Sequence, residues 1–165
     1  MDIGPFMLTL INYWDSLPDY DNILKIHTKK GQGRSGGVWR DQMIRSLAGS
    51  EIIIRHNLQL LSKPDVGMLC CRDRISDFLA ANAETILALR QKLGIYTGSY
   101  FAAGTMFWVK AHLYQRYCSI ELLRDLYSRL EEGALIDSHV GTITHALERM
   151  FGYMVQDANL RIVGV

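Results

Sequence analysis

One short stretch places the strongest limit on the fold of this chain. An apolar run with two isoleucines occupies most of residues 22–27, ends abruptly at His27, and is followed by Lys29, Lys30 and a glycine-rich segment at 31–37. This pattern predicts a buried central strand whose carboxyl end opens onto a cationic loop. Ligands of open α/β sheets bind at that edge. Because side chains alternate along a strand, His27 and Lys29 should point the same way.

The positive charges of this loop would suit a phosphorylated ligand. Lys30 and Arg34 would join Lys29 beside the flexible backbone of the glycines. Fixed cations and backbone N–H groups are what a phosphate or diphosphate requires. A solvated basic turn without a ligand explains the same residues, so spacing alone leaves both interpretations open.

The rest of the chain alternates helix-like and strand-like segments. Helices are expected at 2–17 with Asp2 as the cap, 38–47, 50–61 with Ser50 as the cap, 111–117, 119–131 and 142–155, and two helical stretches are expected within 77–93. Further strands are expected at 66–71, at 100–110 with a bulge or a close ligand approach at Gly104, and at 160–165 as an edge. Helix-rich connections between short strands predict an α/β fold with a layered sheet and flanking helices. A chain of 165 residues with 48% hydrophobic content fits one domain over residues 1–165.

Composition argues against several classes of partner and location. A net charge of +1, from 18 basic and 17 acidic side chains, gives no overall field for a nucleic acid. The 3 cysteines fit neither a disulfide framework nor a metal-spaced set, so a reducing, cytoplasmic location is expected, with Cys70 and Cys71 filling the core. No apolar run approaches the roughly 20 residues of a membrane span. Peripheral association with the inner face of a membrane would therefore need partners.

Four motifs, in order along the chain, are recognisable together. They are His27-Thr28-Lys29-Lys30, Trp39-Arg40, the segment 101–108 (FAAGTMFW), and Gly141-Thr142 followed by His145, Glu148 and Arg149. With the opening Asp2-Ile3-Gly4-Pro5-Phe6, they resemble the rhamnan synthesis protein F family. Its members are glycosyltransferase-like proteins of bacterial surface polysaccharide and O-antigen assembly.

The resemblance implies a fold related to the GT-A glycosyltransferases, which are Rossmann-like, with a nucleotide-sugar donor and a glycan acceptor. Rhamnose is one sugar that it suggests. An Asp-x-Asp motif normally holds a divalent metal, Mg²⁺ or Mn²⁺, on the donor diphosphate in that fold, whereas this chain has His27-x-Lys29 at the equivalent place. We expect Lys29 and Lys30 to neutralise the leaving diphosphate in place of the metal. His27 as a metal ligand is the alternative, although the loop has no Asp or Glu to complete a hard-cation site.

The same fold normally begins with a strand, but this chain opens directly into a predicted helix. We therefore expect the first strands of that fold to be missing, and the segment resembles the C-terminal part of a longer family pattern. Donor binding would then need an upstream half or another chain.

Glycosyl transfer also needs a base for the acceptor hydroxyl, and Asp137 and His145 are the catalytic candidates. The family often has an Asp directly before its Gly-Thr pair, where this sequence has Val140, so Asp137 is displaced by three positions and equally suits a turn cap. His145, Glu148 and Arg149 share one helix face. They would contact the acceptor or a phosphate, with Glu148 orienting one of the others, or they would form a buried polar network.

The remaining substrate-binding candidates are Asp2, Arg40, Gly104 and Thr105. The resemblance implies that an acceptor approaches Gly104-Thr105, while Arg40 would reach the diphosphate or pair only with a neighbouring aspartate. Three functions therefore compete. They are a nucleotide-sugar glycosyltransferase, a non-catalytic remnant that binds a glycan or a partner, and a phosphate-binding hydrolase that uses His27 or His145.

Overall fold

The computed structural model describes residues 2–28, 34–132 and 141–165. Its helices are α1 (Ile3–Asn12), α2 (Arg34–Ala48), α3 (Glu51–Leu61), α4 (Ala83–Leu93), α5 (His112–Tyr117), α6 (Ile120–Ser128) and α7 (Ile143–Asp157). Its strands are β1 (Asn22–Lys25), β2 (Val66–Cys70), β3 (Ile75–Ser76), β4 (Phe101–Ala102), β5 (Phe107–Lys110) and β6 (Arg161–Gly164). Short 3₁₀ turns lie at Leu17–Asp19, Arg72–Arg74 and Ala80–Asn82.

The strands form a mixed sheet and a small ribbon. The four-stranded sheet has the order β1-β5-β2-β6, and a two-stranded sheet pairs β3 with β4. Strand β5 is antiparallel to both β1 and β2, while β2 is parallel to β6. Strands β1, β2 and β6 therefore end at the same edge of the sheet, where β5 begins. The predicted α/β class is confirmed.

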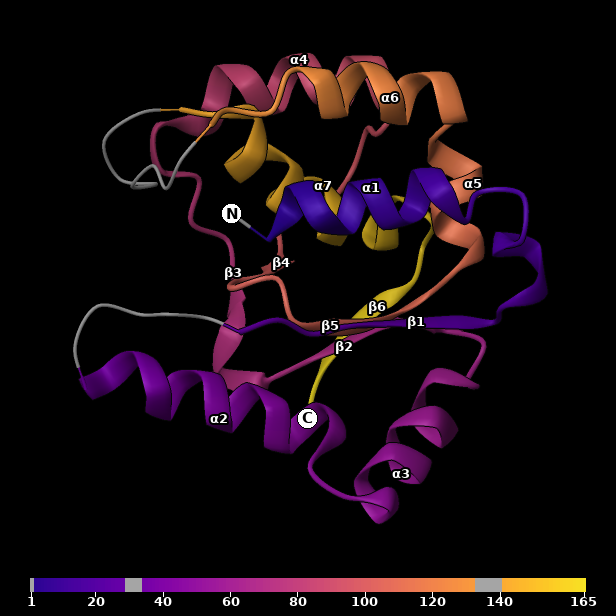
Figure 1. The fold of residues 1–165 in the computed structure, drawn as a ribbon, viewed down its shortest axis with the longest axis vertical. Coiled ribbons are helices and arrows are strands. Elements are labelled where there is room, and N and C mark those ends of the chain that lie inside the picture. Colours follow the sequence, from indigo (N-terminus) through magenta and orange to yellow (C-terminus); the bar gives the residue numbers. More distant parts are fainter. Residues whose placement is uncertain (1, 29–33, 133–140) are drawn as a thin grey trace.

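Helices cover both faces of the sheet. In Figure 1, α1 and α7 lie over one face and α2 and α3 over the other, with α4 and α6 as an outer layer above α1 and α7. The main core lies between the sheet and the α1/α7 layer and includes Met68, Cys70, Phe107 and Val109. Alternate residues such as Trp108 pack toward α2 and α3 instead. The alternation of side chains along each strand thus divides the apolar residues between two cores.

Two predicted strands differ from the structure. The strand predicted at 22–27 as buried and central is the half-buried strand β1, which stands at the edge of the sheet because β5 is its one neighbour among the described strands. The single strand predicted at 100–110 is wrong, since β4 and β5 belong to different sheets. The backbone turns between them because Gly104 and Thr105 have positive φ angles of 87° and 53°.

The first helix also differs from its prediction. Helix α1 ends at Asn12, and Leu17 lies in a separate 3₁₀ turn. Asp2 occupies the N-cap position but its side chain makes no capping hydrogen bond. Its carboxylate is bound to Lys25 and Thr105 instead. The predicted cap at Ser50 is confirmed, because its hydroxyl accepts a hydrogen bond from the backbone N–H of Ile53.

The structure describes the state of the cysteines and the length of the helices. Cys70 and Cys71 are buried as predicted, and both are free thiols, as is Cys118. Burial raises the pKa of Cys70 to about 12, so this thiol is protonated and inert near neutral pH. Within the part of the chain that the structure describes, no helix has the length and apolar character needed to cross a bilayer.

Candidate functional site

A cavity of about 290 Å³ lies beside the turn that connects β4 to β5. Its lining comprises Asp2, Ile3, Trp39, Ser76, Phe78, Phe101, Ala103, Gly104, Thr105, Thr144, His145, Glu148 and Arg149. Known ligand pockets begin at roughly 300 Å³. The cavity thus has room for a small group, and it gathers most of the site residues that the sequence predicts in the described part of the chain.

The turn that forms one wall of the cavity is conformationally demanding. The backbone N–H of Thr105 donates to the carbonyl oxygen of Ala102 at 3.1 Å, which closes a turn with Gly104 at its third position. That position needs a positive φ, which glycine adopts without steric cost. Thr105 is also left-handed, with φ 53°. A β-branched residue in that region carries strain of about 1–3 kcal/mol.

A buried lysine holds this turn. Lys25 is 5% exposed and lies on the α1/α7 face of β1, next to Phe107. Its Nζ donates to Oδ2 of Asp2 at 2.5 Å, to the carbonyl oxygen of Thr105 at 2.8 Å and to Oγ1 of Thr105 at 3.0 Å. The three donors of the ammonium group are therefore all used. The Thr105 hydroxyl in turn bonds to the carboxylate of Asp2.

The electrostatics of this pair follow from burial and proximity. Burial alone would raise the pKa of Asp2, but the charge and hydrogen bond of Lys25 outweigh it and lower the pKa. Burial lowers the pKa of Lys25, and the attraction of Asp2 offsets part of that change. The 2.5 Å distance between Nζ of Lys25 and Oδ2 of Asp2 is that of a hydrogen-bonded ion pair, and it has little exposure.

His27 binds the same turn. Its Nε2 lies 2.9 Å from the carbonyl oxygen of Gly104 and 3.3 Å from Oδ2 of Asp2. A carbonyl can only accept, so Nε2 carries a proton and donates it. This nitrogen therefore offers no lone pair to a metal or to a reacting proton. Within the described residues, no group of three His, Cys, Asp or Glu side chains is arranged to hold a metal ion.

Helix α7 contributes the opposite wall through Glu148 and Arg149. Oε1 of Glu148 accepts the backbone N–H of Gly104 at 2.7 Å, and its Oε2 accepts Nη1 of Arg149 at 3.0 Å. Arg149 is 1% exposed and also donates to the carbonyl oxygens of His145, at 2.9 Å, and Phe78, at 3.1 Å. The predicted shared face is present, and its side chains form a network that joins α7 to the turn.

The first backbone N–H groups of α7 are all occupied by protein side chains. The side chain of Asn82 accepts the backbone N–H of Thr142 at 2.9 Å, and the carboxylate of Glu131 accepts those of Ile143 at 2.6 Å and Thr144 at 3.1 Å. The hydroxyl of Thr142 accepts the backbone N–H of His145 at 3.1 Å and also lies 2.7 Å from Nδ1 of that histidine. Burial would raise the pKa of Glu131, but these hydrogen bonds outweigh it and lower the pKa. This helix end therefore has no N–H group left for a phosphate.

Comparison with known proteins identifies the family. The sequence matches the family described as Rhamnan synthesis protein F over residues 2–160. The chain belongs to this family. It is 29% identical over 175 residues to the uncharacterized protein WxcX of Xanthomonas campestris pv. campestris strain B100, covering 99% of this chain and 24% of that protein. The WxcX protein of a second strain is 28% identical with the same coverage.

The match covers only part of each relative. The chain spans about a quarter of the length of the curated relatives that it matches, since it covers 24% of each. No solved structure matches it.

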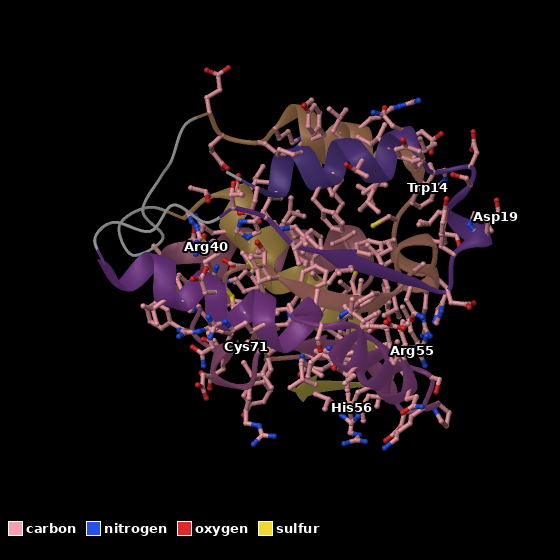
Figure 2. All side chains as sticks on the ribbon, turned by 60° about the horizontal axis from the view of Figure 1, so that its bottom comes forward. Trp14, Asp19, Arg40, Arg55, His56 and Cys71 are labelled. Carbon is pink, nitrogen blue, oxygen red and sulfur yellow. The ribbon has the colours of Figure 1, made fainter. Side chains whose placement is uncertain are left out.

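Arg40, in the Trp-Arg motif that supported the resemblance to this family, lies outside the lining of the cavity. Its Nε and Nη2 donate to Oδ1 of Asp41 at 2.9 and 2.7 Å, which is the neighbour pairing left open by the sequence. Figure 2 shows Arg40 on α2, far from Trp14 and Asp19 at the other end of the molecule. The preceding residue, Trp39, does line the cavity, and the guanidinium of Arg74 lies 4.6 Å from its ring centre.

Three predicted site residues of the family resemblance lie outside the described part of the chain. They are Lys29, Lys30 and Asp137. The side chain of Arg34 is likewise not described. Their roles therefore remain predictions.

Two residues that build the site were missed by sequence reasoning. Lys25 interrupts an apolar run, and the alternation that places His27 and Lys29 on one face also places Lys25 there. That signal could have identified it. The sequence predicts Glu131 only as the last residue of the helix at 119–131, and nothing local indicates that its carboxylate caps a helix that begins at Ile143.

Proposed function

We propose that this chain forms the sugar-binding wall of a glycosyltransferase-type enzyme, which transfers a sugar from a nucleotide-sugar donor during cell-surface polysaccharide synthesis. The observation that carries the proposal is the cavity at the β4–β5 turn, in a chain of the rhamnan synthesis protein F family. Rhamnose is the first sugar to test. We further propose that the sheet is related to that of the GT-A glycosyltransferases, and that the reaction takes place on the cytoplasmic side.

The lining of the cavity has the chemistry that a saccharide needs. The carboxylate of Glu148 and the hydroxyl oxygen of Thr144, whose proton is donated to Glu131, can accept hydrogen bonds from sugar hydroxyls. Aromatic side chains of the lining, including Trp39 and the exposed Phe78, offer apolar surfaces to the C–H faces of a ring. Small-ligand sites combine apolar walls with a few directed polar groups in this way.

The donor diphosphate needs positive charge from elsewhere. The amino end of α7 is already capped by Glu131 and Thr142, so it is a poor anion site. Lys29 and Lys30 follow His27 closely in the sequence, and His27 itself contacts the cavity turn. We therefore assign the diphosphate to these lysines without a divalent metal, with Asp137 or His145 as the base for the acceptor.

Calorimetric titration with a panel of nucleotide sugars, including thymidine-diphosphate rhamnose, tests the proposal. The experiment uses this chain and, in parallel, a full-length Xanthomonas relative, because the chain matches only 24% of that protein. We expect saturable binding by at least the full-length protein. Absence of binding by both would reject the transferase function.

The metal-free assignment gives a separate prediction. Donor binding should persist in EDTA and should weaken by at least about tenfold in the Lys29→Ala/Lys30→Ala variant, because two fixed cations near a diphosphate are lost. The Lys63→Ala/Lys92→Ala variant has the same net charge and serves as the control. Loss of binding in EDTA with wild-type lysines would show instead that a metal is required.

A non-catalytic glycan-binding remnant is the second candidate. It is favoured by the hydrogen bonds that tie Arg149 and Glu148 to backbone groups of the protein itself. This function predicts binding of an oligosaccharide by the full-length protein without turnover of any nucleotide sugar. Release of a nucleoside diphosphate that depends on acceptor would reject it.

A further inference from the structure

We propose that Lys25 is a positioning residue of the candidate site, which holds Thr105 in its left-handed conformation and so fixes the shape of the cavity wall. The consequence for ligand binding rests on the proposed function, whereas the effect on Thr105 does not. No sequence motif or family resemblance discussed above includes Lys25 among the site residues.

The contacts of Lys25 point to Thr105. Two of its three hydrogen bonds end on that residue, one on the carbonyl oxygen at 2.8 Å and one on Oγ1 at 3.0 Å. The third reaches Asp2, whose carboxylate also bonds to the Thr105 hydroxyl. Backbone and side chain of Thr105 are therefore both fixed, at a φ of 53° that a β-branched residue ordinarily avoids.

Apart from Thr105 and the Asp2 carboxylate, which itself binds Thr105, the surroundings of Lys25 are largely apolar. Its Nζ lies 5.5 Å from the ring centre of Phe6 and 6.0 Å from that of Phe107, on a sheet face that otherwise packs apolar side chains. Burying an ammonium group there is unfavourable unless it is paired and hydrogen-bonded. An apolar residue would serve the core better, but it would leave the carbonyl oxygen of Thr105 without its donor.

The position of Lys25 relative to the cavity explains how it would act. Asp2, Gly104 and Thr105 line the cavity, while Lys25 lies behind them and does not. A ligand would thus contact the turn and not the lysine. Strained backbone that is held by its surroundings is characteristic of functional sites. We infer that Lys25 pre-organises the turn for the saccharide part of the ligand.

The test exploits the difference between alanine and glycine at position 105. Lys25→Met is made in the wild type, in Thr105→Ala and in Thr105→Gly. Both substitutions remove the hydroxyl, but only glycine adopts a positive φ freely. The exposed Lys63→Met variant is the matched control. Two readouts are used, namely the ¹³Cα and ¹³Cβ chemical shifts of Thr105, which report its backbone conformation, and titration with thymidine-diphosphate rhamnose.

We expect Lys25→Met to move the Thr105 shifts away from left-handed values and to weaken binding by about tenfold. In the Thr105→Gly background the same substitution should weaken binding by no more than about twofold, because glycine keeps the turn without help. In the Thr105→Ala background the full loss should remain. Left-handed shifts for Thr105 in Lys25→Met, or equal losses in the glycine and alanine backgrounds, would overturn the proposal.

Two further arrangements keep the result decisive. If Lys25→Met does not fold, the Asp2→Asn/Lys25→Met variant, which buries no unpaired carboxylate, replaces it with the same readouts. If the wild type does not bind thymidine-diphosphate rhamnose, this sugar nucleotide is rejected as the ligand. The chemical shifts of Thr105 alone then decide the role of Lys25.

Discussion

Arg149 illustrates how single residues join separate parts of this site. Its buried guanidinium contacts the backbone of its own helix at His145, the carboxylate of Glu148 and the carbonyl of Phe78 from a distant segment. It also lies 4.5 Å from the ring centre of Phe101 in β4. A planar guanidinium can donate to several partners at its edge while its face lies against an aromatic ring. Arg149 therefore organises the cavity wall whether or not it also contacts a ligand.

This arrangement predicts a large effect of Arg149→Met on stability. Removing the cation takes the Arg149 donors away from Glu148, whose side chain is 14% exposed, and from two carbonyl oxygens. We expect a loss of about 3 kcal/mol in the free energy of unfolding, measured with urea. Arg129→Met is the control, since that side chain is 57% exposed and its ion pair with Asp125 should contribute less than about 1 kcal/mol. Equal losses in the two variants would contradict this role.

The sequence predicted local groupings of residues better than distant ones. His145, Glu148 and Arg149 were placed together because helical spacing alone puts them on one face. Lys25 and Thr105 lie 80 positions apart, and their contact depends on the register in which β1 pairs with β5. Nothing in either segment specifies that register before the sheet is known. The sequence therefore marks Gly104 as a special backbone position but does not predict that Lys25 holds the turn.

At the scale of elements, both ends of α7 are fixed by polar side chains. Glu131 and Thr142 cap its beginning, while Asp157 at its end accepts the backbone N–H groups of Tyr96 and Thr97 at 2.8 and 2.9 Å. Oδ2 of Asp157 also accepts the hydroxyl of Tyr117 at 2.8 Å. The segment after α4 is thereby attached to the end of α7. One helix thus supports both the cavity wall and the connection into β4.

Asp157 gives a prediction for the pH dependence of stability. Burial would raise its pKa, but the hydrogen bonds from Thr97, Tyr96 and Tyr117 outweigh it, so the folded-state pKa lies below the ordinary value of 3.8. A carboxyl with a lowered folded pKa stabilises the protein above its unfolded pKa, and this contribution is lost as the pH falls through the folded pKa.

Wild type should therefore lose more stability than Asp157→Asn between about pH 5 and pH 3. Urea midpoints of both proteins at pH 7, 5 and 3 provide the measurement. A wild type and a variant that lose stability in parallel over this range would show that Asp157 makes no such contribution.

Helices whose apolar residues recur at helical spacing were predicted well, whereas the single strand predicted at 100–110 was wrong. The expected helices at 38–47 and 142–155 correspond to α2 and α7, because apolar spacing and capping residues mark them. Residues on both sides of Gly104 favour strands, so the run resembles one continuous strand. The left-handed φ of Thr105, which redirects the chain, has no signature in composition because threonine rarely adopts it.

At the scale of the whole molecule, the sheet separates two apolar regions that share its strands. Helix α1 near the amino terminus and α7 near the carboxyl terminus pack into the same core, with Phe6 and Phe151 at a ring-centre distance of 5.6 Å. On the other face, Trp108 of β5 packs toward α2 and donates from Nε1 to the carbonyl oxygen of Leu47 at 2.9 Å. Unfolding of either region would disrupt the shared sheet and expose the apolar side chains of the other region. This favours one cooperative domain.

We therefore predict a single unfolding transition for residues 1–165. Trp14 packs against the α1/α7 core, whereas Trp39 and Trp108 pack on the α2/α3 side, so tryptophan fluorescence can follow each face separately. The Trp14→Phe variant keeps Trp39 and Trp108 as reporters, and the Trp39→Phe/Trp108→Phe variant keeps Trp14. In urea, both fluorescence transitions should coincide with that of far-UV circular dichroism in the same variant, because a two-state protein gives one midpoint for every probe. Midpoints that differ between the two faces, beyond the shift that each substitution causes in circular dichroism, would mean that the α2/α3 layer unfolds independently of the core beside the candidate site.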